Sequence, residues 1–543
     1  MMKIQMDNRS YKFILIPSLI FIVAVSARII PGPRTIDDAY ITFRYAYNIL
    51  DGNGFVFNSG ERVLGTTTPI YTLLMVFTGQ FFGGRDANFP QIAFILNAVI
   101  GGLECVFLYY LGLHFGSKLA AIGTALVWSI APYSVTFAVG GLETSLYVLL
   151  LTATVTFYLT KRYPLSALFA ALSILTRPDA IILIFPLIID RLWQQAIFML
   201  YEDNSSQSTR SYRISQQGIK FLYEIVAFSV PLILWGGFSY YYFGSPIPHS
   251  ISAKSVAYLL PAYAGFIRLL QHYATPFLGH LSFGNQWIVI GLVIYLFSFI
   301  IGAKQAIKVD KRSWPYIIYP WLYFLVFAIA NPLIFRWYLT PVLPPYILII
   351  LIGIDNLIGD IWHFLPTKSK NVHLVKQVFA VTIIIFLPTI LSLRDWQVLP
   401  DHGIKRPAPS MAWYKLELLY EQAAGYIKPA LVDNPNTILA ASDVGMLGYK
   451  TQATILDTVG LNTPISSSYY PADPDIYITN YAIPPELILD QKPDYIVILE
   501  VYGRGGLIGN PQFQTEYEQI KKIPTDIYGS DGMLIFKRNN NRS

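Results

Sequence analysis

The chain has little cysteine and little charge. Among its 543 residues there is one cysteine, Cys105, so neither an intrachain disulfide nor a cysteine-based metal site can form. Charged residues make up 13% of the chain, whereas a soluble enzyme carries about twice that fraction. The formal net charge of +6 is modest and spread among loops, which argues against nucleic acid as a partner.

Several catalytic signatures are missing as well. The sequence contains no phosphate-binding glycine loop, no metal-spaced cluster of histidines and cysteines, and no nucleophile elbow. These absences argue against ATP-driven chemistry. No small-residue cleavage site follows the first apolar run, at 11–30, so we expect this run to be a retained membrane helix rather than a signal peptide.

Long apolar runs are what the chain has in abundance, since 54% of its residues are hydrophobic. They predict a polytopic α-helical membrane protein with about eleven spans. We place the spans at 11–30, 89–113, 119–138, 143–160, 164–176, 180–193, 221–243, 284–303, 314–331, 338–358 and 374–391. The apolar segment 68–82 is shorter, and we expect a helix that lies in the membrane interface.

The distribution of lysine and arginine predicts a cytoplasmic N-terminus. The first loop, 31–88, follows a single span and therefore lies on the outer face. Because the number of spans is odd, everything after the last span lies on the same face. We expect a membrane domain at 1–393 and a soluble α/β domain at 394–543, in which a helix at 413–427 precedes strands at 437–441 and 495–499.

Two adjacent carboxylates, Asp37 and Asp38, follow the first span. They could simply favour the N-terminus of a helix, where free amide groups attract negative charge. Charges this close to hydrocarbon are costly, however, and are usually kept for function. One of the two would be a general base, and its neighbour would tune it or hold a cation, because crowded carboxylates raise one another's pKa.

Six more polar residues are predicted on the outer face. Four of them have a structural alternative: Arg44 and Arg336 could anchor the interface, Glu143 could cap a helix, and Arg177 could pair with Asp179. The remaining two are His249 and Lys254, in a proline-containing loop that enters the outer compartment. One carboxylate, Glu104, falls instead within the second span, where it requires a partner that the sequence does not identify.

The first loop, "DDAYITFRYAYNILDGNGFVFNSGERVLGTTTP", resembles that of the bacterial GT-C glycosyltransferases. Within them it is most similar to the branch that contains the mycobacterial terminal β-(1→2)-arabinofuranosyltransferases. Other stretches fit the same family, and the resemblance covers nearly the whole chain: "GGLETSL" at 140–146, "TRPDA" at 176–180, "FGSPIPHSISAK" at 243–254, "RWYLTPVLP" at 336–344 and "SDVGMLGYKTQATILDTVGL" at 442–461. His249 stands where family members often have asparagine.

The resemblance implies a GT-C bundle and inverting transfer of a sugar, arabinofuranose or another pentose or hexose, from a polyprenyl-phosphate donor. The acceptor would be a cell-envelope glycan or lipid outside the bacterial plasma membrane. Asp37 would be the base, and Asp38 would orient the acceptor or bind a divalent cation. Lys254, Arg336 and Arg44 would offset charge on the leaving phosphate, and Glu143, Arg177 and His249 would line the substrate site.

A transporter or flippase for a lipid-linked sugar is the alternative function. Transporters place polar groups at the middle of the membrane, and Glu104 fits that pattern. Most ionisable groups of this chain gather at one face instead, and a large outer domain follows them, which favours an enzyme.

Overall fold

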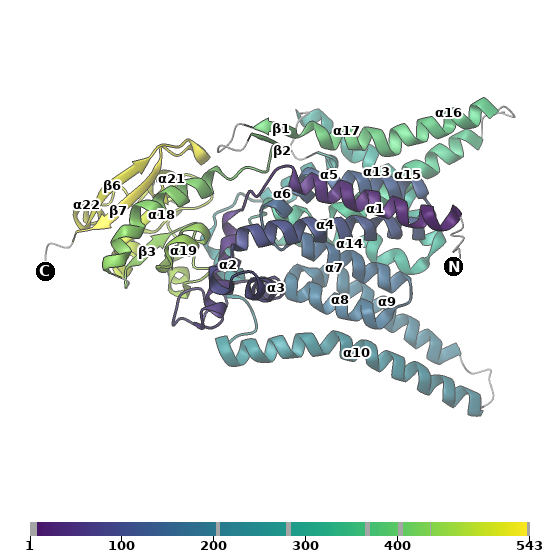
Figure 1. Cartoon of the computed structure of the whole chain (residues 1–543), viewed down its shortest axis with the longest axis horizontal. Helices are drawn as coiled ribbons and strands as arrows, with labels where there is room; N and C mark the ends of the chain where they lie inside the picture. Colours follow the sequence, from purple (N-terminus) through teal and green to yellow (C-terminus); the bar gives the residue numbers. More distant parts are fainter. Residues whose placement is uncertain are drawn as a thin grey trace, which may run out of the picture.

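The structure of the chain, a computed structural model, describes residues 8–201, 207–278, 284–363, 370–399, 405–434 and 436–539. The molecule is elongated (Figure 1). Long helices form a bundle at one end, and a domain that contains a β-sheet forms the other end. The described N-terminal helix begins at the end of the bundle that is farthest from the sheet.

The bundle confirms the predicted helical membrane domain, and each of the eleven expected spans coincides with helical structure. The helices are α1 (Asn8–Ile29), α4 (Phe89–His114), α5 (Lys118–Ile130), α6 (Pro132–Val139), α7 (Thr144–Leu159), α8 (Tyr163–Thr176), α9 (Ile181–Tyr201), α10 (Gln207–Phe243), α13 (Gly284–Val309), α14 (Trp314–Ala330), α15 (Leu343–His363), α16 (Lys370–Val381) and α17 (Leu387–Arg394). A π-helical segment, Thr382–Phe386, joins the last two.

Seven helical segments of the described chain are long and apolar enough to cross a membrane. An eighth appears if α5 and α6 form one span, bent by 43°. Pro132 opens α6, and its missing amide explains the break. The helices at 14–29, 144–159 and 163–176 are apolar but shorter, so the number of eleven crossings stays a prediction.

The interior of the bundle supplies a partner for Glu104. The indole Nε1 of Trp128, on α5, donates a hydrogen bond to the Glu104 carboxylate. The buried guanidinium of Arg28 lies near enough to attract that carboxylate, and it also donates to Ser134 Oγ at 2.6 Å. A buried acid that has a hydrogen-bond donor and a nearby cation is explained by packing alone, without a transport pathway.

The first loop contains two helices, α2 (Asp37–Leu50) and α3 (Pro69–Phe81), and a 3₁₀ turn η1 (Gly84–Asp86). The expected short helix is therefore present as α3, and Phe77, Phe81 and Phe82 at its end are more than 60% exposed. Exposed aromatic side chains on a short apolar helix suit a membrane interface. Later segments add α11 (His249–Ala257), α12 (Ala264–Ala274) and the 3₁₀ turn η5 (Arg336–Leu339).

The C-terminal domain has the expected α/β character. Its five-stranded sheet has the order β4-β3-β5-β7-β6, with β3 (Ile438–Ala441), β4 (Thr454–Asp457), β5 (Tyr495–Leu499), β6 (Tyr517–Ile523) and β7 (Met533–Arg538). Strand β3 pairs in parallel with β4 and β5, whereas β7 is antiparallel to β5 and β6. A separate hairpin, β1 (Trp396–Leu399) and β2 (Arg406–Pro409), connects the bundle to this domain.

Helix α18 (Lys415–Asp433) confirms the helix that the sequence predicted ahead of the strands. The short helix α19 (Gly445–Thr451) connects β3 to β4. Helices α20 (Pro485–Gln491), α21 (Glu500–Gly503) and α22 (Pro511–Glu516) complete the domain, with the 3₁₀ turns η8 (Pro464–Tyr469), η9 (Pro474–Ile476) and η10 (Ile527–Gly529).

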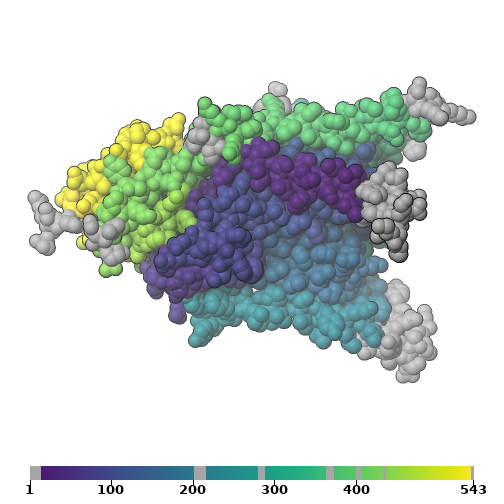
Figure 2. All heavy atoms as spheres, in the orientation of Figure 1, coloured from purple at the N-terminus to yellow at the C-terminus, as the bar shows by residue number. Residues whose placement is uncertain are grey.

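The soluble domain lies directly against the first loop (Figure 2). Two buried side chains of that loop explain this packing. Arg44 donates from Nε to the carbonyl of Phe57 and from Nη2 to the carbonyl of Ala453, both at 2.6 Å. The side-chain amide of Asn58 accepts a hydrogen bond from Ile455 N and donates one to Ile455 O, both at 2.9 Å. A neighbouring strand would make the same two kinds of bond. Asn58 thereby satisfies the free edge of β4.

Candidate active site

The acidic pair opens α2 at the junction between the bundle and the soluble domain. The capping residue of α2 is Ile36, which makes no side-chain hydrogen bond to the helix. Asp37 is buried, with 6% of its surface exposed, and Asp38 is half-buried. The two neighbours therefore occupy different environments.

The Asp37 carboxylate binds the soluble domain. Its Oδ2 accepts from Gly445 N at 2.9 Å and its Oδ1 accepts from Met446 N at 2.7 Å, at the start of α19. The Asp37 amide donates to Glu417 Oε1 on α18 at 3.1 Å. Burial and the nearby Asp443 carboxylate raise the pKa of Asp37 well above its usual range, although the two amides act in the opposite direction.

Asp38 faces a different set of groups. The negative charge of Asp38 raises the pKa of Lys254 on α11 and that of Glu143, which precedes α7. The Lys254 ammonium lies 4.8 Å from the ring centroid of Phe335. Burial opposes the charge on Lys254, yet Tyr338 and Asp38 outweigh it and raise the pKa of this lysine. Asp38 is thus the acid of the pair whose charge acts on Lys254.

Glu143 and Arg177 extend this polar group into the bundle. Arg177, which is 3% exposed, donates to both carboxylate oxygens of Asp179, at 3.0 and 3.1 Å. Its Nη1 lies 3.6 Å from Glu143 Oε1. The guanidinium also lies over the Tyr338 ring, 4.5 Å from its centroid. Arg177 therefore makes the structural pair that its spacing from Asp179 allows, and it connects that pair to the acidic site.

The soluble domain contributes acids through the carboxyl ends of its parallel strands. Strand β4 lies on one side of β3 and β5 lies on the other, so the chain connections that follow β3 and β4 lead to opposite sides. In open α/β sheets, ligands bind at the carboxyl ends of strands at such a switch point. Asp443 follows β3 there, and its Oδ2 accepts from Tyr420 Oη at 2.8 Å. Burial raises the pKa of Asp443 to about 6.

No site role was assigned to Asp443 or to Glu417 from the sequence. The signal for Asp443 was its place directly after an apolar strand. Glu417 gave no comparable signal, because it is one of several charged residues on an amphipathic helix. Burial raises the pKa of Glu417 to about 7.

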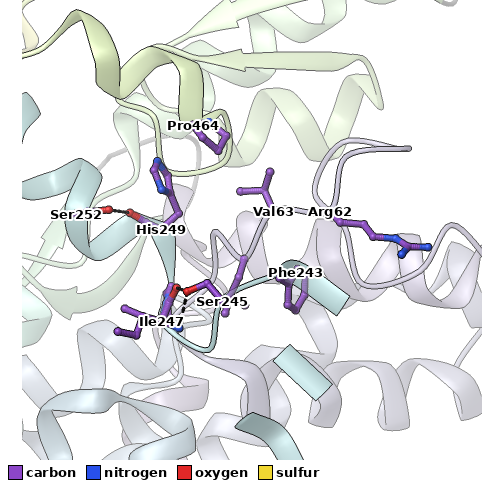
Figure 3. A pocket seen from close by; sticks show the side chains of 10 residues that line it. Arg62, Val63, Phe243, Ser245, Ile247, His249, Ser252 and Pro464 are labelled. Carbon is purple, nitrogen blue, oxygen red and sulfur yellow. Dashed lines mark hydrogen bonds between the residues drawn. The ribbon is translucent and has the colours of Figure 1, made fainter. Parts of the chain in front are cut away.

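Three predicted site residues make their described contacts with groups other than the acidic pair. Arg44 is 2% exposed and is occupied by main-chain carbonyls. His249 lies in a cavity of about 290 Å³ where the first loop, the end of α10 and the soluble domain meet (Figure 3). Its ring is 3.2 Å from Ser467 Oγ, and partial burial lowers its pKa. Arg336 lines another cavity, with its guanidinium 5.2 Å from the ring centroid of Trp413.

The described acidic residues do not form a recognisable metal site. Within the described ranges, no three histidine, cysteine, aspartate or glutamate side chains come together in a way that could hold an ion.

Comparisons with known proteins agree with this architecture. A family model described as a domain of unknown function, DUF8728, matches residues 413–536, which is most of the soluble domain. A terminal β-(1→2)-arabinofuranosyltransferase of Mycobacterium tuberculosis is 29% identical over 188 residues. That match spans 30% of this chain and 30% of the relative, so most of the relative's length is not covered.

Solved structures match along almost the whole chain. The oligosaccharyltransferase of Archaeoglobus fulgidus in its apo form has a TM-score of 0.53 at 12% identity, over 98% of this chain and 75% of the other. ArnT from Cupriavidus metallidurans, bound to undecaprenyl phosphate, has a TM-score of 0.50 at 13% identity, over 98% of both chains. These chains are GT-C enzymes, and the protein described here has the GT-C membrane fold that they share.

Proposed function

We propose that the protein is an inverting glycosyltransferase that moves a sugar from a polyprenyl-phosphate donor to a glycan or lipid acceptor at the outer face of the membrane. The observation that carries this proposal is the half-buried Asp38 carboxylate, whose charge raises the pKa of Lys254, at the junction of a GT-C bundle and a soluble domain. The similarity to an arabinofuranosyltransferase supports glycosyl transfer, and the ArnT complex supports a polyprenyl phosphate as the lipid.

In this reaction Asp38 removes the proton from an acceptor hydroxyl, and the oxygen attacks the anomeric carbon from the face opposite the phosphate. The bond between that carbon and the phosphate oxygen breaks, and polyprenyl phosphate leaves. The transition state has oxocarbenium character, as in other glycosyl transfers. Lys254 stabilises the negative charge that grows on the leaving phosphate.

Asp37 has a positioning role in this scheme. Both of its oxygens already accept amide hydrogen bonds, so it fixes α2, and with it Asp38, against the soluble domain. This assignment differs from the one that the family resemblance implied, in which Asp37 was the base. The raised pKa of Asp37 makes it a group that could hold a proton, but its carboxylate is the less exposed of the two.

Arg177 and Glu143 contribute to the same site indirectly, through the residues that they contact. The ion pair with Asp179 holds the Arg177 guanidinium next to the ring of Tyr338. Tyr338 in turn raises the pKa of Lys254. Glu143 interacts electrostatically with both Arg177 and Asp38. We assign both to the orientation of Lys254 and Asp38 rather than to contact with the reacting atoms.

The outer location follows from the same proposal. The acidic pair, α3 and the soluble domain all lie at one end of the bundle, opposite the described N-terminal segment. With a cytoplasmic N-terminus in a bacterial plasma membrane, this end is extracytoplasmic, where a lipid-borne donor is the available activated sugar.

The test uses the purified full-length protein in nanodiscs with a panel of polyprenyl-phosphate sugars and a cell-envelope glycan and lipid extract as the acceptor, and measures release of free polyprenyl phosphate. Asp38→Asn should lower the rate about 10²–10⁴-fold, as expected for loss of a general base. Asp86→Asn is the matched control, because that carboxylate of the first loop is 82% exposed. A chelator arm determines whether a divalent cation takes part.

Two outcomes would contradict the proposal. If the wild type binds a donor but releases phosphate from none of the panel, glycosyl transfer is the wrong reaction, and a flippase assay follows. If Asp38→Asn retains turnover while Asp37→Asn abolishes it without loss of thermal stability, Asp37 is the base and the roles proposed here for the pair are reversed.

A further inference from the structure

A second cavity lies beside the η5 turn, and Lys254 is not among the residues that line it. It has a volume of about 410 Å³ and lies between α6, α12, η5 and the segment that connects β2 to α18. The residues that line it combine two arginines with neutral polar and apolar side chains: Tyr133, Arg268, Gln271, His272, Thr275, Leu278, Arg336, Leu339, Ser410, Met411 and Trp413.

Among the described residues, neither arginine of this cavity forms an ion pair within 4.0 Å. Arg336 donates one hydrogen bond, to the carbonyl of Met411 at 3.3 Å, and lies 5.2 Å from the Trp413 ring centroid. Within the same described ranges, Arg268 has no hydrogen bond either. Burial and the charge of Arg268 both lower the pKa of Arg336. The cavity therefore holds two guanidinium groups that no described carboxylate pairs with directly.

Two acids occur nearby, but neither forms an ion pair with these arginines within 4.0 Å. The charge of Glu417 contributes weakly to the pKa of Arg336, and its Oε1 accepts from the Asp37 amide. The charge of Asp395 acts, together with those of Arg268 and Arg336, on Tyr133 in the lining of the cavity. His272 adds no further charge, because burial lowers its pKa to about 3.

The remaining lining defines the chemistry of an occupant. Two guanidinium groups supply more donors than one carboxylate can accept, and their planar forks suit the non-bridging oxygens of a phosphate ester. Leu278, Leu339 and Met411 add apolar surface. On the outer side of α12, Phe266 is 39% and Ile267 is 53% exposed, which places apolar surface next to the cavity.

We propose that this cavity binds the phosphate ester of a lipid headgroup, through Arg268 and Arg336, at a site separate from Asp38 and Lys254. The site is defined by binding, so it stands whether or not the transferase proposal does. An anion there neutralises the mutual repulsion of the two arginines and connects α12 to the segment that leads into the soluble domain.

The experiment measures binding of short-chain lipids to the full-length protein in neutral detergent, by native mass spectrometry and by quenching of tryptophan fluorescence. The probes are phosphatidic acid, phosphatidylglycerol, phosphatidylcholine and water-soluble glycerol 3-phosphate. We expect the two anionic lipids to bind. Arg268→Gln and Arg336→Gln should each weaken them at least tenfold, and the double variant should lose saturable binding. Affinity should also fall as salt is added.

The matched control is Arg62→Gln, because Arg62 lines the other cavity, over the ring of Tyr242. It should bind the lipids as the wild type does. Arg268 is exposed, so its variant tests the site without disturbing packing, and thermal unfolding confirms that Arg336→Gln is folded. Unchanged binding in the double variant, or equal binding of phosphatidylcholine, would overturn the proposal. Equal binding of glycerol 3-phosphate would overturn the lipid assignment.

Discussion

Asp37 and Gly445 are in such close contact that no side chain fits between them. A Cβ atom on Gly445 would overlap the main-chain carbonyl oxygen of Asp37 and lie 2.9 Å from its Oδ2. The Gly445 amide donates to that carboxylate. Residues at opposite ends of the sequence thus form one rigid contact, and the acidic pair has a fixed position relative to the soluble domain.

Gly445→Ala should separate α2 from α19 and reduce turnover about 10-fold or more, because displacements of about 1 Å from a productive geometry have large effects on rate. The measurement is release of polyprenyl phosphate together with thermal unfolding. Gly425→Ala on α18 is the control, since a Cβ there meets nothing within 4 Å. Equal activity of the two variants would show that this close approach does not matter.

Arg44→Gln should lower the free energy of unfolding by about 3 kcal/mol, because two buried carbonyls lose a charged donor. Denaturant unfolding in detergent measures this loss, and limited proteolysis shows whether the soluble domain is released from the first loop. Arg85→Gln, at an arginine that is 55% exposed, should leave both readouts unchanged. A stable Arg44→Gln variant that loses donor binding would instead support the phosphate contact predicted from the sequence.

Asn58→Ala should destabilise the same interface by about 1–3 kcal/mol, since it leaves the amide and the carbonyl of Ile455 unpaired at the edge of β4. Hydrogen exchange at β4 reports this directly, with faster exchange expected at Ile455. Asn53→Ala is the comparison, because the side-chain amide of Asn53 bonds only within the first loop. Unaltered exchange at β4 would mean that Asn58 does not protect the edge.

Stability should rise on acidification from about pH 8 to pH 5. Burial raises the pKa of Glu417 from 4.5 to about 7 and that of Asp443 from 3.8 to about 6. The folded state therefore binds these protons more tightly than the unfolded state does, and the resulting stabilisation is lost as the pH rises through the folded pKa values. Thermal unfolding across this pH range measures the effect.

Glu417→Gln should reduce this dependence and raise the unfolding temperature at pH 8 by about 2 °C, because a buried charge is removed while an acceptor for the Asp37 amide remains. Glu421→Gln, at an exposed glutamate on the same helix, should keep the wild-type profile. A flat profile in the wild type would exclude both raised pKa values.

The sequence was sufficient to predict the helices and two of the strands because apolar periodicity is a local property. The helix at 69–81 and the strands at 438–441 and 495–499 coincide with its predictions. The partners of Arg44 and Glu104 could not be predicted, since Ala453 and Trp128 become neighbours only through tertiary packing. The same holds for the rings of Phe335 and Trp413, which lie beside Lys254 and Arg336 respectively.

The contacts of Asp37 and Arg44 also constrain how the protein is made. Their partners in the soluble domain lie 408 and 409 residues further along the chain. At roughly 5–20 residues per second, a ribosome needs about 20–80 seconds to reach them. During that interval the first loop has been synthesised but lacks the amides and carbonyls that order it. Biogenesis therefore leaves the acidic pair unassembled until most of the polypeptide has been made, and a product truncated before these residues has no formed site.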